Sequence, residues 1–462
     1  MSSSVSERLT RFAREWSARG APGEATHEAK RLLLNQLKAS VAATDREAVR
    51  LLHEWARPSD PVSGGAHVLW YGTRTDPERA AVVNGALFEV LDFHDTYIPC
   101  FMHATSAVLP AVLAQAEVGG QSGAEVVTAL TLGMEVELAV ATMLMPTGYY
   151  RGYVPAGLTG GVGAAAACSL LAGLDEERMR NALGIAMCTA FGLYVSVGSM
   201  TLSYITGATA RSGLTAFALA ERGFDAPPTA FEGDKGMFVT HTDEDAAKIE
   251  GVLDSLGSTW RIHGQSYKTV PTETITHPAI ECALELRARA GGREVKRMRF
   301  AVQPIVKEIV DERWERFGVP STELTARFDL LFCAAAAWER GRFTLAEMQE
   351  PAYTDPAILA LRERSELVPD PARESFDGCS LTVEFTDGST ETSSVDAFLG
   401  SPGRRMSDAQ LSELFRTSAG ELLAPGRADA ILDATWGLEE APSVHDLMSL
   451  ATLARDDGGG TP

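Results

Sequence analysis

Clustered cysteine is the first feature that this sequence lacks. Six cysteines, at positions 100, 168, 188, 282, 333 and 379, are scattered along 462 residues, with no Cys-x-x-Cys pair and no Cys/His group at zinc spacing. Structural zinc modules need such groups, and an iron–sulfur cluster needs several thiolates brought together. We therefore expect buried, reduced thiols and neither a metal nor an organic cofactor.

Positive charge is also scarce. The chain has 41 basic against 62 acidic residues, which gives a formal net charge of −21. Such a field repels nucleic acid and does not steer an anionic metabolite toward the protein. No basic stripe, RNA-binding motif, GxxxxGK phosphate loop or dinucleotide fingerprint offsets it. We therefore expect a small-molecule substrate and no nucleic-acid partner.

The glycine run at residues 157–163, GLTGGVG, does not complete a phosphate loop. It stands before an alanine-rich helical stretch and lacks the Lys-Ser/Thr that such a loop requires. Close packing between helices is the use that we expect for it.

Long apolar runs with membrane flanks are missing as well. The first residues, MSSSVSERLTRF, lack the apolar core of a signal peptide. A cytoplasmic protein without a membrane partner is expected. The 45% hydrophobic and 22% charged residues are normal for a soluble globular enzyme, and 462 residues exceed one ordinary core. Two domains are therefore expected.

Helical periodicity dominates the first half of the chain. The segments VSERLTRFAREWSA, EATHEAKRLLLNQLKASVAA, GAEVVTALTLGMEVELAVATMLM, the alanine-rich run after residue 163 and MRNALGIAMCTAFGLYVSV all favour helices. Strand-like alternation appears later, at 295–306 and 381–395, and Asp387-Gly388 marks a tight hairpin turn. A helical stretch, LTARFDLLFCAAAAWERG, lies between them, and helix returns from 407 to 451.

The densest group of chemically active side chains lies in LDFHDTYIPCFMHATS, residues 91–106. It holds Asp92, His94, Asp95, Thr96 and His103 behind an apolar helical stripe. We expect the helix to continue through this motif, so that Asp92 and Thr96, at i and i+4, share one face of its end. A carboxylate, a hydroxyl and two imidazoles would then lie together.

This stretch resembles the NGA-x-x-H-x-L-D-F-D-D-T segment of the MmgE/PrpD superfamily, the group of 2-methylcitrate dehydratase and cis-aconitate decarboxylase. The resemblance continues in order along nearly the whole chain, through GGVGAAAACSLLAGLDEERMRNALGIA (160–186), GSMTLSYITGATARSGLTAFALAERGF (from 198), SYKTVPTETITHPAIECAL (266–284) and LGSPGRRMSDAQLSELF. It implies an enzyme and says little about which activity this chain has.

Periodicity and the resemblance predict the same architecture. The fold is expected to be mainly α, with a large multihelical domain at residues 1–265 plus 405–452 and an inserted smaller α+β lid domain at 266–404. Residues 453–462, which end in DDGGGTP, are expected to be a disordered tail. The resemblance further implies an active site in the cleft between the domains, and a homodimer.

Several site residues match the family pattern. Asp92 and Thr96 match the first Asp and the Thr of D-F-D-D-T, and His94 replaces its second Asp. His103 matches the downstream His, although the intervening YIPCFM is one residue longer than usual. Lys268 and His277 match the Lys and His of F-K-x-Y-P-x-x-x-x-x-H. We expect His103, Lys268, Asp92 and Thr96 to be catalytic, with His103 for acid/base chemistry and Lys268 for carboxylate or enolate stabilisation.

Four other positions depart from the pattern by becoming apolar. Val154 stands for the His before the glycine-rich helix, Leu202 and Ile205 for the Lys and His of T-K-x-x-H, and Phe332 for a Tyr of the lid domain. A citrate-like substrate needs cationic partners for each buried carboxylate, and these replacements remove them. We expect a substrate-binding surface formed by His277, His94, Tyr153, Val154, Leu202, Tyr204, Ile205 and Phe332.

Three hypotheses of function follow. An apolar wall with a few donors suits a cofactor-independent cyclase or isomerase of a large, mostly uncharged unsaturated substrate, such as a polyketide intermediate in natural-product biosynthesis. The alternative is a lyase of the family's ordinary kind, a dehydratase, decarboxylase or epimerase of a small carboxylate. The third is a non-catalytic relic, against which the retained polar residues count. Turnover of 2-methylcitrate or cis-aconitate would favour the alternative.

Overall fold

A computed structural model describes residues 4–58 and 64–453 of the chain. Of the expected tail at 453–462, residues 454–462 lie outside these residues. The chain divides into a helical unit, residues 1–265 and 407–462, and a sheet unit, residues 266–406, which are described separately. The mainly α fold with a small sheet domain is confirmed, because the large unit is almost entirely helical and the described sheet of more than two strands lies in the small one.

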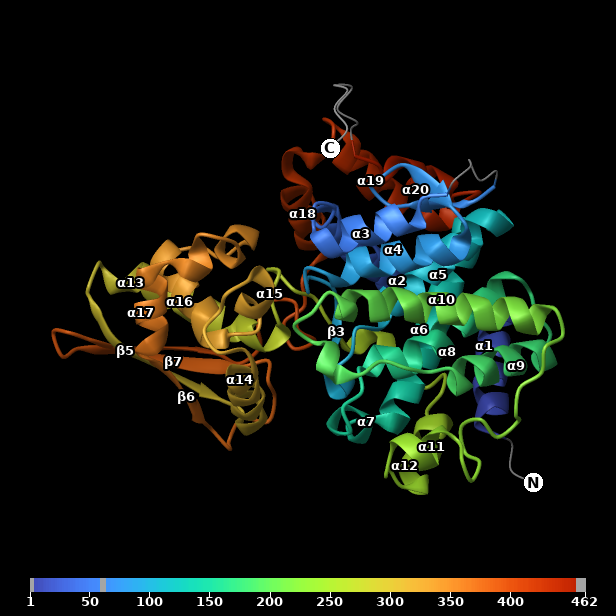
Figure 1. Ribbon diagram of the computed structural model, residues 1–462, viewed down its shortest axis with the longest axis horizontal. Coiled ribbons are helices and arrows are strands. Elements are labelled where there is room, and N and C mark those ends of the chain that lie inside the picture. The colour runs from blue at the N-terminus through green and yellow to red at the C-terminus, as the bar shows by residue number, and fades with distance from the viewer. Residues whose placement is uncertain (1–3, 59–63, 454–462) are drawn as a thin grey trace. The chain divides into compact units, whose positions relative to one another are not determined.

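The helical unit is built from elements of both ends of the chain (Figure 1). Its helices are α1 (Val5–Arg19), α2 (Gly23–Val41), α3 (Glu47–Ala56), α4 (Pro77–Glu89), α5 (Ala104–Gly119), α6 (Gly123–Leu144), α7 (Thr147–Tyr150), α8 (Pro155–Leu171), α9 (Glu176–Cys188), α10 (Thr201–Glu221), α11 (Met237–His241), α12 (Ala246–Asp254), α18 (Asp408–Ala419), α19 (Arg427–Trp436) and α20 (His445–Leu450).

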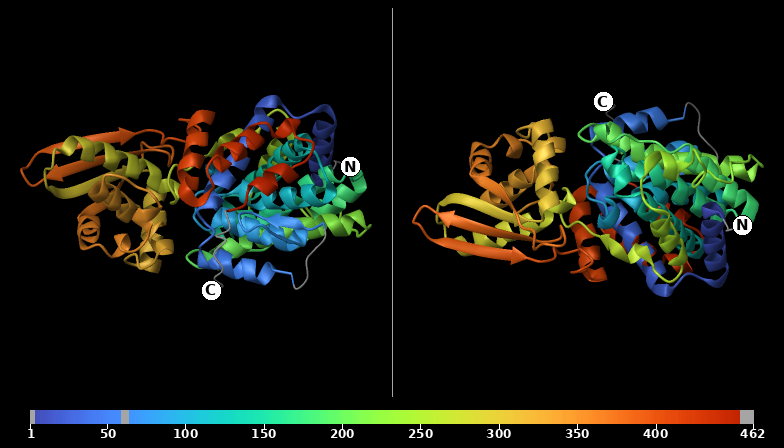
Figure 2. Two further views of the ribbon diagram at one scale, coloured as in Figure 1. Left: turned by 90° about the horizontal axis from the view of Figure 1, so that it is seen from above. Right: turned by 90° about the horizontal axis from the view of Figure 1, so that it is seen from below.

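Short strands and 3-10 turns connect these helices. They are β1 (Ala66–Val68), β2 (Thr73–Thr75), β3 (Thr96–Tyr97), η1 (Ile98–Cys100), η2 (Tyr194–Ser196), η3 (Arg261–Gly264), η7 (Gly420–Leu422) and η8 (Leu438–Glu440), with β4 (Gln265–Ser266) where the chain leaves the unit. The last helices pack on the first ones, α18 and α19 against α2, as the red and blue ribbons of Figure 2 show.

Helices α4, α5, α6, α8 and α10 form the centre of the helical unit. Their close approach depends on glycine. A Cβ on Gly160 of α8 would lie 2.5 Å from the Cβ of Ala107, and one on Gly207 of α10 would lie 2.1 Å from the carbonyl oxygen of Val82. The glycine run therefore packs helices, as expected, but it lies inside α8 and not before it.

One described helix, α6, is long and apolar enough to cross a membrane by length and composition. Of its most apolar window, 89% is buried inside the unit. Such burial is typical of the core helix of a globular protein.

The sheet unit contains a four-stranded sheet in the order β6-β5-β7-β8, with β5 and β6 parallel and the other pairs antiparallel. Its elements are η4 (Thr274–Thr276), α13 (His277–Ala290), β5 (Val295–Val302), α14 (Pro304–Phe317), α15 (Glu323–Ala326), α16 (Leu330–Arg340), η5 (Leu345–Met348), η6 (Ala352–Thr354), α17 (Pro356–Glu363), β6 (Ser365–Pro369), β7 (Cys379–Phe385) and β8 (Thr390–Val395). Helix α13 packs on β7 and β8 and against α16, which α17 flanks in turn (Figure 1).

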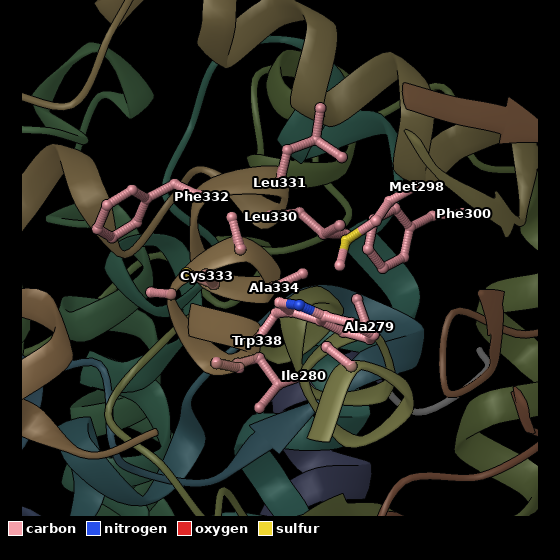
Figure 3. Packing of buried hydrophobic residues seen from close by; sticks show 14 of the residues in the cluster. Ala279, Ile280, Met298, Phe300, Leu330, Leu331, Phe332, Cys333, Ala334 and Trp338 are labelled. Carbon is pink, nitrogen blue, oxygen red and sulfur yellow. The ribbon is translucent and has the colours of Figure 1, made fainter. Parts of the chain in front are cut away.

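The apolar core of the sheet unit lies between this sheet and its helices. Alternation along β7 points Leu381 and Val383 inward, and both are 0% exposed. Figure 3 shows Met298 and Phe300 of β5 facing Leu330, Ala334 and Trp338 of α16. The predicted turn at Asp387-Gly388 joins β7 to β8, where Gly388 has a φ of +83°.

The structure corrects several expected boundaries. The strand over 295–306 ends at Val302, because Pro304 starts α14. The helix over 324–341 is broken at Asp329, whose carboxylate caps the backbone N–H of Phe332. The helix that begins at MRNALG ends at Cys188, and the thiol of Cys188 is exposed, not buried as expected.

Candidate active site

The segment after α4 forms a compact turn, not the expected helix. Helix α4 ends at Glu89, and the backbone N–H of Asp92 donates to the Glu89 carbonyl at 2.9 Å. Asp92 has a φ of +50°, a left-handed conformation that Asp tolerates better than most residues. Thr96 lies in β3. The prediction that Asp92 and Thr96 share a helix face is therefore wrong, because the backbone reverses at Asp92.

This turn brings His94 back against the end of α4. The Nε2 atom of His94 lies 3.4 Å from Oε2 of Glu89, and the Glu89 carboxylate also accepts from the hydroxyl of Thr206 on α10 at 3.2 Å. His94 is 0% exposed and Glu89 is 6% exposed. The imidazole of His103 stands at 81° to that of His94, with ring centroids 4.0 Å apart. The ligand atoms of Glu89, His94 and His103 all lie within 4.8 Å of one another.

His103 directly precedes α5, and its ring is held in one orientation. Its Nδ1 lies 2.8 Å from the backbone oxygen of Asp95 and 3.3 Å from the hydroxyl of Thr96. A carbonyl oxygen only accepts hydrogen bonds, so Nδ1 carries the hydrogen of the neutral ring and Nε2 is its basic nitrogen. The half-buried His103 can therefore take up a proton at Nε2.

The carboxyl group of Asp95 is fully buried beside this cluster. It accepts from Nε2 of Gln36 at 2.7 Å and from the hydroxyl of Thr105 at 2.9 Å. Burial nevertheless raises the pKa of Asp95 to about 6. On α6, burial and the negative charge of Asp95 raise the pKa of Glu137 well above its usual value. Both shifts extend to higher pH the range in which these buried carboxyl groups hold their proton.

The predicted polar residues of the helical unit lie in this one segment. Asp92, His94 and Thr96 are 8%, 0% and 6% exposed. Lys268 and His277 belong to the sheet unit, where both are buried. The His277 ring packs 5.2 Å from the ring of Phe398.

Two of the apolar replacements meet around one glycine. A Cβ on Gly192 would lie 3.1 Å from Cγ2 of Ile205 and 3.7 Å from the Cβ of Val154. Both side chains are buried, and they form an apolar patch beside α8 and α10. Val154 and Ile205 therefore share one apolar environment around Gly192.

The other predicted substrate-binding residues of the helical unit differ in exposure. Leu202 is half-buried, Tyr204 is exposed, and the ring of Tyr153 lies 4.8 Å from that of His241. Phe332 is 0% exposed and belongs to the buried apolar cluster of the sheet unit, where its ring points away from Met298 and Trp338 (Figure 3).

Sequence reasoning missed two residues of this site. Glu89 stands at the position of the His in the family motif NGA-x-x-H, so the motif itself carried the signal. The acid and the imidazole are exchanged: Glu89 replaces a His, and His94 replaces an Asp. The second residue is Lys38 of α2, fully buried, whose Nζ lies 3.6 Å from the centre of the Phe93 ring. No sequence pattern marked Lys38, although every residue of α2 from Glu28 to Val41 is buried.

Comparison with known proteins covers both units. The MmgE/PrpD N-terminal domain model matches residues 7–250, and the MmgE/PrpD C-terminal domain model matches residues 270–439. Cis-aconitate decarboxylase of Homo sapiens is 26% identical over 443 residues, which covers 92% of this chain and 89% of the relative. Cis-aconitate decarboxylase of Aspergillus terreus is 25% identical over 479 residues, 97% and 96% of the two chains. The 2-methylcitrate dehydratase of Salmonella typhimurium is 23% identical over 461 residues, 91% and 92%.

Proposed function

Because the chain belongs to the MmgE/PrpD family, we propose that it is a lyase that removes carbon dioxide or water from a small carboxylic acid. The relatives' activities support this reading over the cyclase or isomerase expected from the apolar replacements. The observation that carries the proposal is the orientation of His103, whose Nδ1 is engaged by the Asp95 carbonyl oxygen at 2.8 Å.

Decarboxylation and dehydration of such acids both need a proton moved at a carbon or hydroxyl beside a carboxylate. Nε2 of His103 is the group that would take up or deliver this proton. Glu89 and His94 would support this proton transfer. The buried Glu89 carboxylate lies 3.4 Å from Nε2 of His94, and its negative charge stabilises a positive charge on the His94 and His103 rings. Lys268 is the proposed partner of a substrate carboxylate, from its match to the family's F-K-x-Y-P segment.

The test compares His103→Gln with the unaltered protein on cis-aconitate and 2-methylcitrate, with products followed by proton NMR. Loss of an acid/base group should lower kcat by roughly 10²-fold or more. His53→Asn is the matched control. His53 lies on α3 and its ring nitrogen Nε2 bonds the hydroxyl of Thr73 on β2, so it belongs to neither the His94 nor the His103 contacts. Turnover of either acid that His103→Gln leaves unchanged would refute the role of His103.

A second candidate is supported by one specific observation. Val154 and Ile205, which replace polar residues of the family, pack around Gly192 as an apolar patch. Such a patch favours an uncharged carbon skeleton, as in cyclisation or isomerisation of a polyketide-like chain. Thermal-shift measurements separate the two candidates. Stabilisation by unsaturated apolar ligands, with none by citrate-like anions, would favour the second.

A further inference from the structure

A second group of imidazoles and a carboxylate lies in the helical unit, outside the candidate active site. It consists of His67 of β1, Glu117 in the last turn of α5 and His445, the first residue of α20. Oε1 of Glu117 lies 2.5 Å from Nδ1 of His67 and 3.7 Å from Nδ1 of His445. Three elements distant in sequence therefore direct their donor atoms toward one point.

The position of Glu117 makes its negative charge costly. Its side chain is 0% exposed, and the negative end of the α5 dipole lies close by. Burial and the dipole both disfavour a carboxylate there unless a cation compensates it. Among the described residues, the ionic contacts of Glu117 are with these two imidazoles.

Secondary contacts orient all three donors. The backbone N–H of His67 donates to Oε2 of Glu117 at 2.7 Å, which turns the other oxygen, Oε1, toward both rings. Nε2 of His445 lies 3.4 Å from the hydroxyl of Ser449, so its Nδ1 faces the carboxylate. The amide of Asn84 donates to the backbone oxygen of His67 at 3.0 Å and anchors β1. Such outer contacts are typical of metal-binding histidines and carboxylates.

We propose that His67, Glu117 and His445 form a Zn²⁺ site. In a tetrahedral zinc site, bonds of about 2.0–2.1 Å place neighbouring ligand atoms about 3.4 Å apart. The distances of 2.5 Å and 3.7 Å from Oε1 bracket that value, so small side-chain rotations suffice. Two imidazole nitrogens and one carboxylate oxygen select zinc over Mg²⁺ or Ca²⁺, which prefer oxygen ligands. His445 is 49% exposed, which gives the ion a path in and leaves a position for water.

The ion would bind the C-terminal helix α20 to β1 and α5, a structural role independent of the proposed lyase activity. No metal was expected from the sequence, because these ligands are 50 and 328 positions apart and follow no spacing rule.

Isothermal titration of the EDTA-treated full chain with ZnCl₂ tests the proposal. The expected result is about one equivalent of Zn²⁺ per chain, together with a rise in Tm that MgCl₂ does not produce. His445→Ala removes a half-exposed ligand without disturbing the core, and it should weaken binding by about tenfold or more. Glu117→Gln should do the same, whereas the control His53→Ala should bind zinc as the unaltered chain does.

Co²⁺ gives an independent readout, because a tetrahedral Co²⁺ site absorbs strongly in the visible range and His445→Ala should lose that band. The absence of zinc binding would overturn the proposal. So would binding that His445→Ala leaves intact and His94→Asn abolishes, since the ion would then occupy the Glu89, His94 and His103 group.

Discussion

Asp95→Asn tests whether a buried carboxyl group beside the candidate active site makes stability depend on pH. Asp95 is 0% exposed, and burial raises its pKa from 3.8 to about 6. Asparagine has nearly the same shape and can keep bonds to Gln36 and Thr105, but it cannot ionise. The variant therefore removes the ionisation and little else.

The magnitude follows from the pKa shift. Because the folded state holds the proton more tightly than the unfolded state, its stability is fully present below pH 3.8 and is lost as the pH rises through 6. A shift from 3.8 to about 6 corresponds to about 3 kcal/mol, at about 1.4 kcal/mol per pH unit. About 1 kcal/mol of this is already lost at pH 4.5, which leaves about 2 kcal/mol between pH 4.5 and pH 8.

Urea unfolding of both proteins, followed by circular dichroism at pH 4.5 and pH 8, measures this difference. The free energy of unfolding of Asp95→Asn relative to the unaltered protein should increase by about 2 kcal/mol from the lower to the higher pH. Asp387→Asn is the control. Asp387 lies in the exposed hairpin turn, where the hydroxyl of Ser389 lowers its pKa, so this variant should gain nothing at pH 8. A pH-independent difference for Asp95→Asn would refute the argument that burial of this carboxyl group is costly.

Other variants test packing, burial and capping. Gly163→Ala should lower Tm, because its Cβ would lie 2.7 Å from the Cβ of Glu137, whereas Gly251→Ala, with open space around it, should leave Tm unchanged or raise it. Burial raises the pKa of Glu135 to about 7, so Glu135→Gln should gain relative stability between pH 4.5 and pH 8, in a window higher than that of Asp95; equal stability differences at both pH values would contradict this. Ser122→Ala removes the capping box of α6 and should cost about 1 kcal/mol in urea unfolding; Ser122→Thr, which keeps a cap, should lose less.

The sequence alone was sufficient for the fold class. Apolar residues recur at helical spacing over the first 220 positions and alternate along β7, and these periods decide which faces can be buried. The Asp387-Gly388 pair marked the hairpin, because its glycine has to adopt a positive φ. The family motif also located the segment from Asp92 to His103, since residues close in sequence lie close in space.

Only the tertiary structure decided the backbone path of that segment and the contacts of its side chains. The reversal at Asp92 depends on packing that no local pattern reports, and it places His94 against Glu89 in place of continuing α4. Phe332 was expected to line a substrate-binding surface, and the structure buries it in the apolar cluster of the sheet unit. His67, Glu117 and His445 come together from three distant elements. The periodicity of apolar residues shows which side of a helix or strand is buried. Contacts between elements distant in sequence depend on how whole helices pack, and no local spacing of residues in a single sequence reports that packing.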